Sequence, residues 1–378
     1  MKIQQCHWSA QEGWAANAPV RCPETQLVLA FGGRSVLGGG APLDALRDAY
    51  PNAHLLGCST SGEICGVSVS DDTLVTTAVH LEHSGVEARQ IALDEVADST
   101  AAGATLAGML DHEGLRHVLV LSDGLNVNGS DLVKGLTQEL PGHVTVTGGL
   151  SGDGADFQET LVLADGEPRS NVVAALGLYG DRLSIGYASK GGWDQFGPER
   201  VVTRSEGNVL YELDGRSALE LYKEYLGEHA SGLPATGLLF PLSLRDEHGD
   251  EPVMRTILGV DEESRSMTFA GDLPEGAYAR LMRANFDRLV DGAGDAAQHA
   301  LASHPDGAPD LAILISCVGR KMVLKQRVEE EVEAVRHVLG EGAVLTGFYS
   351  YGEISPFTHD ARCQLHNQTM TITSLSER

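Results

Sequence analysis

The sequence lacks the signals of export, of membrane insertion and of a zinc or redox cysteine motif. Its first 20 residues contain no apolar stretch of the length that a signal peptide needs. No run approaches the roughly 18 apolar residues of a membrane span. The six cysteines form no CxxC pair and are few for 378 residues. We therefore expect a cytoplasmic protein with free thiols and no membrane insertion.

Positive charge is also scarce. The chain has 27 Lys and Arg against 53 Asp and Glu, which gives a formal net charge of −26. An acidic surface repels the phosphate backbone, so nucleic-acid binding is excluded as a main function. Nucleotide-binding signatures are missing too, because no Walker lysine follows the glycines of residues 31–40 and the Rossmann spacing is absent.

Glycine, in contrast, is abundant. It occupies 45 of the 378 positions, about 12%, where about 7% is ordinary. Apolar residues make up 42% of the chain, enough for sizeable cores, and the length suggests two domains. The glycine excess indicates either a loosely built chain or many tight turns.

A threefold internal repeat explains where part of the glycine lies in the sequence. Each copy has a short apolar run that reads as a buried strand, then a polar or glycine-containing loop, a helix pattern and a second strand. The first strands are expected at 27–31, 117–121 and 311–315, and the second strands at 53–57, 143–148 and 343–347. The pattern predicts an α/β fold in which repeated βαβ-turn-β units form mixed sheets flanked by helices, in two domains.

The turns that follow the second strands share a signature of glycine, hydroxyl and acid. They read GCSTSGEI (57–64), GGLSGD (148–153) and GFYSYGEI (347–354). In these turns Thr60, Ser151 and Ser350 correspond, as do Glu63, Asp153 and Glu353. Ligands usually lie beyond the carboxyl ends of such strands, so we expect the turns to converge on one ligand pocket. The other interpretation is that each acid accepts hydrogen bonds from its own loop.

The chemistry of a hydrolase is only partly present in these turns. Residues 149–153 read GLSGD, so Asp153 stands where a nucleophile elbow has glycine. We therefore expect a binding protein and not an enzyme. A hydrolase that uses Ser151 or Ser350 stays as an alternative.

At these turns and in several other short segments the sequence resembles the FIST family of bacterial sensory proteins. The resemblance covers about residues 25–375 and implies a FIST N-terminal domain over 25–220 and a FIST C-terminal domain over 221–378. It also implies a binding module for small molecules, with amino acids as a proposed class. The matching segments are GCSTSGEI, GGLSGDGADF, VVAALGL, VMRTILGVD, FAGDLPEGA, ISCVGRK, GFYSYGEISPF and CQLHNQT.

A narrower resemblance is to the nitric-oxide-sensing, haem-binding members of that family. It rests on the chain length and on ISCVGRKMVLKQRVEEEVEAV and GFYSYGEISPF. It implies haem as cofactor, nitric oxide as signal and a partner histidine kinase or cyclic-di-GMP enzyme, and it is compatible with a homo-oligomer. The alternative is a module for an amino acid or similar metabolite without haem.

Three further side chains are candidates for the site. Arg320 could hold a ligand carboxylate or a haem propionate, or it could form an ion pair with a turn carboxylate. Haem needs an axial ligand, for which His366, beside the third turn, ranks first and His54 second. A structural role is the alternative for both histidines. The Cys22-Pro23 pair matches a short word of haem-regulated sites, although two residues recur easily by chance.

Overall fold

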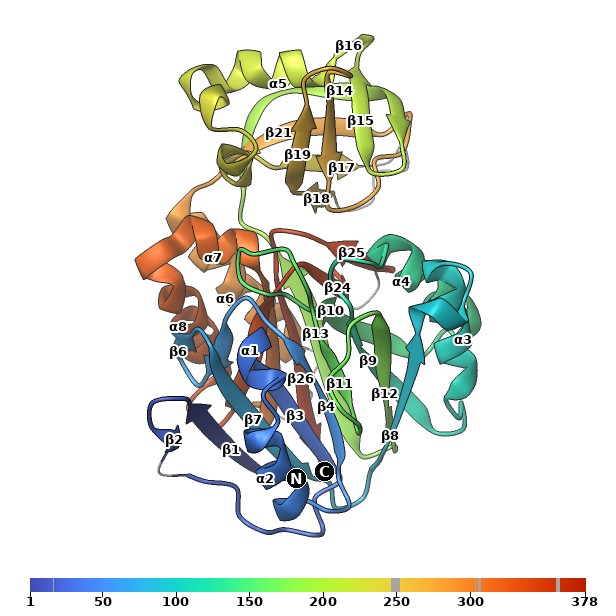
Figure 1. Cartoon of the computed structure of the whole chain (residues 1–378), viewed down its shortest axis with the longest axis vertical. Coiled ribbons are helices and arrows are strands. Elements are labelled where there is room, and N and C mark those ends of the chain that lie inside the picture. The colour runs from blue at the N-terminus through green and yellow to red at the C-terminus, as the bar shows by residue number, and fades with distance from the viewer. Residues whose placement is uncertain (16, 246–251, 303, 305–306, 358–360) are drawn as a thin grey trace.

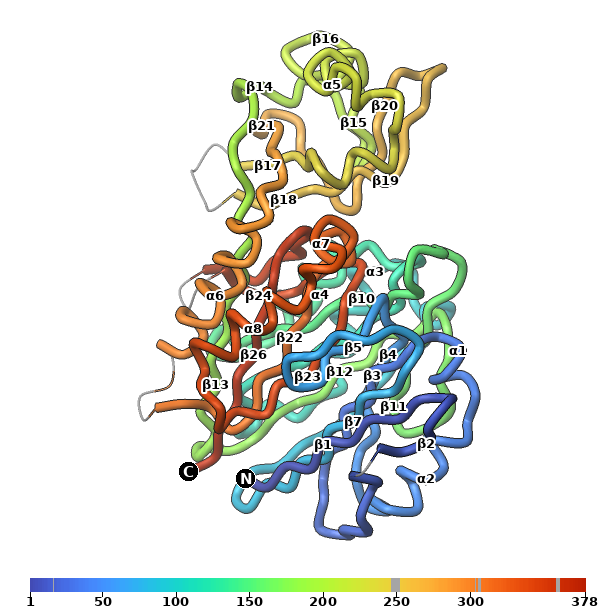
Figure 2. The backbone as a smooth tube through the Cα atoms, turned by 90° about the vertical axis from the view of Figure 1, so that its left-hand side faces the viewer, coloured from blue at the N-terminus to red at the C-terminus, as the bar shows by residue number. Residues whose placement is uncertain are grey.

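Two lobes are stacked along the long axis of the molecule (Figure 1). The computed structural model describes residues 1–15, 17–245, 252–302, 304, 307–357 and 361–378. The lower lobe contains both ends of the chain, which lie at its base (Figure 2), and the upper lobe is formed by residues 194–283. Within the described residues, no helix combines the length and apolarity needed to cross a membrane.

Three sheets of six strands build the lower lobe. The first, in the order β11-β4-β3-β7-β1-β2, consists of β11 (Val162–Ala164), β4 (His54–Ser59), β3 (Leu27–Gly32), β7 (Thr73–His80), β1 (Lys2–Ser9) and β2 (Gly13–Trp14). The second has β25 (Cys363–His366), β24 (Gly352–Pro356), β10 (Thr145–Leu150), β9 (Leu115–Ser122), β12 (Val172–Tyr179) and β8 (Gly85–Ala92). The third has β13 (Leu183–Lys190), β26 (Met370–Glu377), β22 (Leu311–Cys317), β23 (Val344–Ser350), β5 (Glu63–Cys65) and β6 (Ser68–Ser70).

The predicted repeat is confirmed in the pairing of these strands. Each sheet has one parallel pair, β3 with β4, β9 with β10 and β22 with β23, made by the two predicted strands of one repeat. The strand after each turn then pairs with a different repeat: β5 with β23, β11 with β4 and β24 with β10. The three repeats therefore exchange strands in a cycle, and each sheet is completed by a neighbour.

Helices cover the outer faces of the sheets. They are α1 (Arg34–Leu37), α2 (Ala41–Ala49), α3 (Ser99–Met109), α4 (Gly129–Glu139), α6 (Phe286–Ala302), α7 (Val318–Leu324) and α8 (Val328–Leu339). The inner faces pack against one another in a core to which all three sheets contribute, including Leu29, Phe31, Leu121, Ile315 and Phe348. The mixed α/β architecture predicted from the sequence is thus confirmed, with its main core enclosed by three sheets.

In the part of the chain that the structure describes, the upper lobe is a curved sheet with one α-helix packed on it. Its strands are β14 (Asp194–Glu206), β15 (Val209–Leu213), β16 (Arg216–Ser217), β17 (Leu242–Arg245), β18 (Val253–Arg255), β19 (Ile257–Asp261), β20 (Ser266–Phe269) and β21 (Tyr278–Arg283), and its helix is α5 (Ala218–Leu226). The lobe has its own apolar core, with Leu221, Tyr222 and Phe269 among its members. The predicted boundary between residues 220 and 221 falls inside α5 and stays a prediction about domain organisation.

Candidate functional site

The three glycine-rich turns meet at the top of the lower lobe. The backbone N–H of Ser61 donates to Tyr349 O at 2.8 Å, and that of Gly152 donates to Ser59 O at 2.9 Å. The third bond of this kind, from the N–H of Tyr351 to Leu150 O, is 3.2 Å long. Each bond joins one repeat to another, and together they close a ring. The structure therefore brings the three turns together, as the sequence predicts.

The first glycine of each turn is required by the close approach of two strands. A Cβ atom at Gly57 would lie 1.9 Å from the carbonyl oxygen of Ala30, and one at Gly148 1.9 Å from that of Val120. At Gly347 the corresponding distance to Leu314 O would be 1.8 Å. No side chain fits at these positions, so part of the glycine excess serves strand contact and not looseness.

The acids of the first and third turns make the same contacts, one with the hydroxyl of their own turn and two with a threonine further along the chain. Glu353 accepts from the Ser350 hydroxyl at 2.6 Å, and from the N–H and hydroxyl of Thr369 at 3.2 and 3.0 Å. Glu63 accepts from the Thr60 hydroxyl and from the N–H and hydroxyl of Thr73 at 3.0 and 2.7 Å. Both carboxyls are fully buried. Burial raises the pKa of Glu63 to about 7 and that of Glu353 to about 8, against the lowering effect of these hydrogen bonds.

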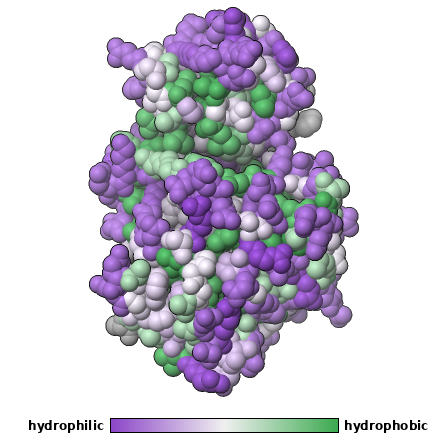
Figure 3. Space-filling view, in the orientation of Figure 1, coloured by the Kyte–Doolittle hydropathy of each residue, from purple (hydrophilic) through white to green (hydrophobic). Residues whose placement is uncertain are grey.

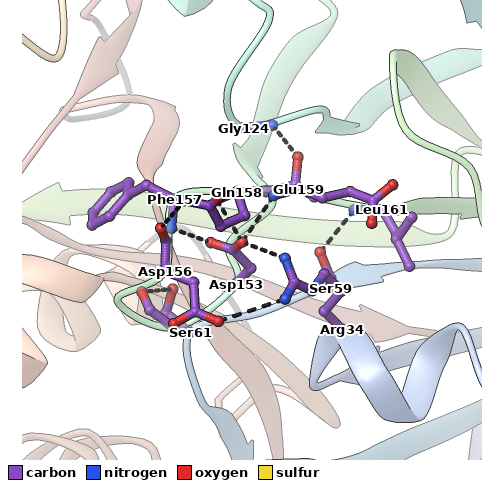
Figure 4. A network of polar contacts seen from close by, with 12 residues as sticks. Arg34, Ser59, Ser61, Gly124, Asp153, Asp156, Phe157, Gln158, Glu159 and Leu161 are labelled. Carbon is purple, nitrogen blue, oxygen red and sulfur yellow. Dashed lines mark hydrogen bonds and ion pairs between the residues drawn. The ribbon is translucent and has the colours of Figure 1, made fainter.

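Asp153 anchors the loop that follows the second turn (Figure 4). Its carboxylate accepts backbone N–H bonds from residues 157, 158 and 159, each 2.9 Å long, and a bond from the Tyr351 hydroxyl. Arg34 adds an ion pair at 3.0 Å. Burial opposes ionisation of this carboxyl, but the bond from Tyr351 and the three N–H bonds outweigh it, so the pKa of Asp153 is lowered.

The turn hydroxyls are as buried as the acids. The Thr60 and Ser350 hydroxyls donate to the acids of their own turns, whereas Ser151 donates to Ser122 O at 2.5 Å. All three residues are at most 3% exposed. The six side chains therefore all have hydrogen-bond partners within the lower lobe, in their own turn or in a neighbouring segment. A ligand-binding role for Thr60, Glu63, Ser151, Asp153, Ser350 and Glu353 stays a prediction.

Arg320 is completely buried, and its guanidinium nitrogens all donate hydrogen bonds to protein atoms. Its Nε and Nη2 bond to Glu331 of α8 at 3.0 and 2.7 Å. Its Nη2 also reaches Leu289 O at 2.7 Å, and its Nη1 reaches Gly191 O at 2.5 Å and Gln368 O at 3.5 Å. Arg320 therefore has an ion-pair partner, but this partner is a helix residue and not one of the turn carboxylates.

Each predicted histidine has one ring nitrogen engaged by a protein group. His366 is fully buried, its Nε2 lies 2.7 Å from Ser355 O, and its ring meets the edge of Phe357 at a centroid distance of 4.2 Å. Burial lowers the pKa of His366 to about 4. His54 is partly exposed and pairs with Asp165 at 2.8 Å. Within the described part of the chain, no group of three or more His, Cys, Asp or Glu side chains is arranged to hold a metal ion.

A cavity of about 940 Å³ lies above the ring of turns, between the two lobes; we call it the interlobe cavity. On the visible face of the molecule, hydrophobic side chains gather where the lobes meet (Figure 3). The lower lobe contributes Leu125, Val127, Phe157 and Met322 to the lining, and the upper lobe contributes Leu233, Ile257, Leu258 and Phe269. Asp272 is the only charged side chain among the described residues that line it. The cavity suits a ligand with a large apolar body.

Phe157 and Tyr351 form a rigid part of the lower wall. Their rings are stacked, with centroids 4.6 Å apart and planes 12° from parallel. Phe157 has a φ of +52°, rare for a residue with a side chain. It is held there because Asp153 binds the N–H groups of residues 157–159 and also the hydroxyl of Tyr351. The turn acid therefore shapes the cavity without facing it.

The upper-lobe half of this lining was missed by reasoning from the repeat. Residues 256–258 and 269–272 are far from the three turns in sequence and carry no catalytic or metal-binding pattern. The family words VMRTILGVD (253–261) and FAGDLPEGA (269–277) contain them, which was the available signal.

Comparison with known families decides what kind of chain this is. Residues 26–216 match the model of the FIST N domain, and residues 218–356 match that of the FIST C domain. The chain belongs to the FIST family. FIST domains are in general small-ligand sensing modules. These matches identify the family but do not identify the narrower haem-binding group.

Relatives of this FIST protein occur in bacteria and archaea. An uncharacterized protein of Mycobacterium tuberculosis strain H37Rv is 28% identical over 344 residues, which cover 87% of this chain and 85% of the relative. An uncharacterized protein of Methanocaldococcus jannaschii is 24% identical over 315 residues, covering 77% of this chain and 59% of the relative.

The expectation that this FIST protein is not an enzyme needs correction, because two of the solved structures matched to it are those of a hydrolase. One is a cyanuric acid hydrolase, with a TM-score of 0.32 and 10% identity over 100% of this chain and 99% of that one. Another, from A. caulinodans, has a TM-score of 0.17 and 12% identity over 78% and 99%. Likeness this low carries no argument about fold or reaction. An enzyme is therefore no longer ruled out for this chain, and no reaction is assigned to it.

Proposed function

We propose that this FIST protein is a cytoplasmic sensor that binds a small molecule in the interlobe cavity. The observation that carries the proposal is the size and lining of that cavity, about 940 Å³ with apolar side chains from both lobes. Cavities of roughly 300–1,000 Å³ with mainly apolar walls are usual for small-molecule sites. The family's general role in small-ligand sensing supports it.

The charge of the lining selects the class of ligand. The described lining residues include Asp272 but no Lys, Arg or His. An anionic group would meet a carboxylate and no cation in the described lining, whereas an amine would find a partner for its charge. We therefore propose a ligand with an apolar body and an amino group. An amino acid or similar metabolite with an apolar side chain meets this description if its carboxylate binds backbone N–H groups.

Occupancy of the cavity would be reported through the arrangement of the lobes. The chain crosses between the lobes twice, between β13 and β14 and between β21 and α6. Side-chain bonds between the lobes include Gln368 Nε2 to Thr256 Oγ1 at 2.9 Å and Asn128 Nδ2 to Asp272 Oδ1 at 3.2 Å. A ligand that contacts both lobes favours one arrangement over others by its differential affinity. The proposed receiver is a partner histidine kinase or cyclic-di-GMP enzyme.

Haem with nitric oxide as signal is a separate proposal, and the predicted histidines do not fit it. His366 and His54 are not among the residues that line the interlobe cavity, and His366 already bonds through Nε2. Haem propionates would also meet Asp272 without a lining cation. An absorption spectrum of the protein reconstituted with haem tests this proposal. Absence of a Soret band would reject haem, and a band unchanged in His366→Ala and His54→Ala would reject histidine ligation.

The sensor proposal is tested by a thermal-shift screen in which each apolar amine is paired with the carboxylic acid of the same skeleton. A bound ligand raises the apparent Tm because it binds only the folded state. We expect amines to be selected over acids, Asp272→Asn to reduce that selectivity, and Phe157→Ala to weaken binding of every hit. Val20→Ala, at an exposed apolar residue outside the cavity, is the matched control. Shifts that are equal in all three variants and wild type would overturn the proposal.

A further inference from the structure

A second cavity, of about 840 Å³, lies between the lobes on the side of α4; we call it the α4 cavity. One face of the helix forms its lower wall, with Ser130, Lys134 and Thr137 among the lining residues. Arg255 of the upper lobe and the chain at residues 363–365 line other sides. Its lining is more polar than that of the interlobe cavity, so a different class of ligand is expected there.

Arg255 supplies a buried guanidinium whose hydrogen-bonding capacity is incompletely used. It is 6% exposed. Its Nε donates to Asp272 O at 3.0 Å, and its Nη1 donates to Met254 O at 3.0 Å and Leu365 O at 3.2 Å. Within the described residues Nη2 donates to no atom, and no carboxylate lies within ion-pair distance of the side chain. The guanidinium hydrogen-bonds only neutral carbonyls, and the Asp272 carboxylate acts on its charge without forming an ion pair with it.

The first turn of α4 presents a second incompletely used group. The Ser130 hydroxyl oxygen is buried and has no hydrogen-bond partner within the described residues. Lys134 lies one turn further on the same face and is exposed. The side chain of Asn128 caps the helix by accepting from the N–H groups of Ser130 and Asp131 at 3.0 and 3.2 Å. The positive end of the helix dipole thus adds to the attraction for an anion.

Two contacts place the guanidinium beside that first turn. Asp272, whose carbonyl oxygen binds Arg255, accepts from Asn128 through its carboxylate at 3.2 Å. Leu365, whose carbonyl oxygen also binds Arg255, packs so closely on Gly129 that a Cβ there would lie 2.7 Å from its side chain. Arg255 is therefore linked to the two residues that precede Ser130.

We propose that the α4 cavity binds the carboxylate or phosphate group of a small metabolite, held by Arg255 Nη2, the Ser130 hydroxyl and Lys134. Arg245 adds little charge, because it pairs with Glu199 at 2.7 Å. Asp272 and Glu275 also line the cavity and limit its total positive charge. The site is thus suited to a small anion and not to a polyanion. The bound anion connects α4 of the lower lobe to β18 of the upper lobe.

The two cavities share a wall, so their occupancies are coupled. Asn128 and Asp272 are joined by a hydrogen bond, and Asp272 lines both cavities. An anion that fixes Arg255 also fixes the carbonyl of Asp272, a residue that lines the interlobe cavity. Only this coupling rests on the proposed sensor function, since the anion site stands without it.

Calorimetric titration of the full-length protein tests the anion site. The probes are inorganic phosphate, acetate and succinate, each against sodium chloride at the same ionic strength. We expect at least one probe to bind, and Ser130→Ala and Lys134→Gln each to weaken its binding about tenfold, as loss of a charge-assisted hydrogen bond does. Lys2→Gln removes the same charge from an exposed strand residue and should leave the affinity unchanged.

The outcomes separate the sources of the anion and the two proposals. Binding of phosphate alone identifies a phosphate ligand, and binding of acetate or succinate alone identifies a carboxylate ligand. Absence of binding by all three probes overturns the proposal, as does equal weakening by Lys134→Gln and Lys2→Gln. Arg255→Lys keeps the charge but removes the fork, and should weaken binding where the variant folds. None of these results depends on an amine ligand in the interlobe cavity.

Discussion

The ring of turns and the cavities above it are neighbours, yet they differ in hydrogen bonding. The polar groups of the turns have partners, whereas some polar groups of the cavities do not. In the turns, each hydroxyl and acid has its hydrogen-bond partners within the lower lobe. In the α4 cavity, the Ser130 hydroxyl and Arg255 Nη2 have capacity left over, and the interlobe cavity has an apolar wall. A shared sequence signature can therefore mark the scaffold of a site, while the ligand contacts lie in less regular segments.

The largest effect is expected where a turn glycine is replaced. In Gly347→Ala the new Cβ would lie 1.8 Å from Leu314 O, so the strands must separate. We expect a loss of about 5 kcal/mol or more, enough to prevent folding of a marginally stable chain. Soluble expression and circular dichroism measure it. Gly108→Ala is the control, because nothing lies within 4 Å of the methyl group that this change would add; if both variants behave alike, the steric argument fails.

The buried ion pair beneath the third turn comes next. Glu331→Gln leaves the Arg320 guanidinium buried without its counter-charge. We expect the free energy of unfolding to fall by about 3–5 kcal/mol. The adjacent Glu330 pairs with Arg327 in a more exposed position, with 42% of its side chain accessible, so Glu330→Gln should have little effect on the free energy of unfolding. Urea unfolding of both variants checks the difference, and similar losses would show that burial does not decide it.

The stability contributed by Glu63 and Glu353 should depend on pH in the opposite sense to that contributed by Asp153. Glu63 and Glu353 have raised pKa values in the folded state, about 7 and about 8. The folded state therefore binds more protons than the unfolded state between about pH 4.5, where free glutamates ionise, and about pH 8. Stability from these two groups is complete below that pH and is lost as the pH rises through 7 and 8. For Asp153, whose pKa is lowered, stability is present at neutral pH and is lost in acid.

The double variant Glu63→Gln and Glu353→Gln measures this effect. Its free energy of unfolding relative to wild type should rise by roughly 1–3 kcal/mol per carboxyl between pH 5 and 8.5. Asp153→Asn should show no such trend over the same range. Equal trends in the two variants would contradict the assignment of the raised pKa values to the first and third turns.

The smallest effect on stability is expected at the wall of the interlobe cavity. Phe157 is 45% exposed although it stacks on Tyr351. Phe157→Ser should lower the free energy of unfolding by about 1 kcal/mol or less, since much of the ring already faces solvent. Chemical unfolding measures this change. A loss above about 3 kcal/mol would place Phe157 in the scaffold and not in the ligand wall.

Much of the lower lobe was predictable because its signals are local. The apolar runs at 27–31, 117–121 and 311–315 form strands, and each pairs in parallel with the strand expected after it. The convergence of the turns followed from strand direction. Both predictions depend on residues close together in sequence, where periodicity and turn chemistry act directly.

Partners distant in sequence could not be predicted in the same way. Nothing near Arg320 indicates that Glu331 of another helix neutralises it, or that Glu63 and Glu353 face inward. The cavities depend on how the upper lobe sits on the lower one, and a contact such as Asn128 with Asp272 leaves no local pattern. Repeat analysis therefore located the scaffold, whereas the proposed ligand contacts required the assembled fold.

The cyclic exchange of strands also governs how the chain reaches its folded state. Cys65 of the first repeat pairs with Thr346 of the third, and Leu150 of the second pairs with Gly352. During synthesis the edges of two sheets thus stay unpaired until the last part of the chain has left the ribosome. Unpaired edges favour aggregation, and pairing over such sequence distances slows folding. The lower lobe should therefore fold as one cooperative unit, and a chain ending before Thr346 should be insoluble.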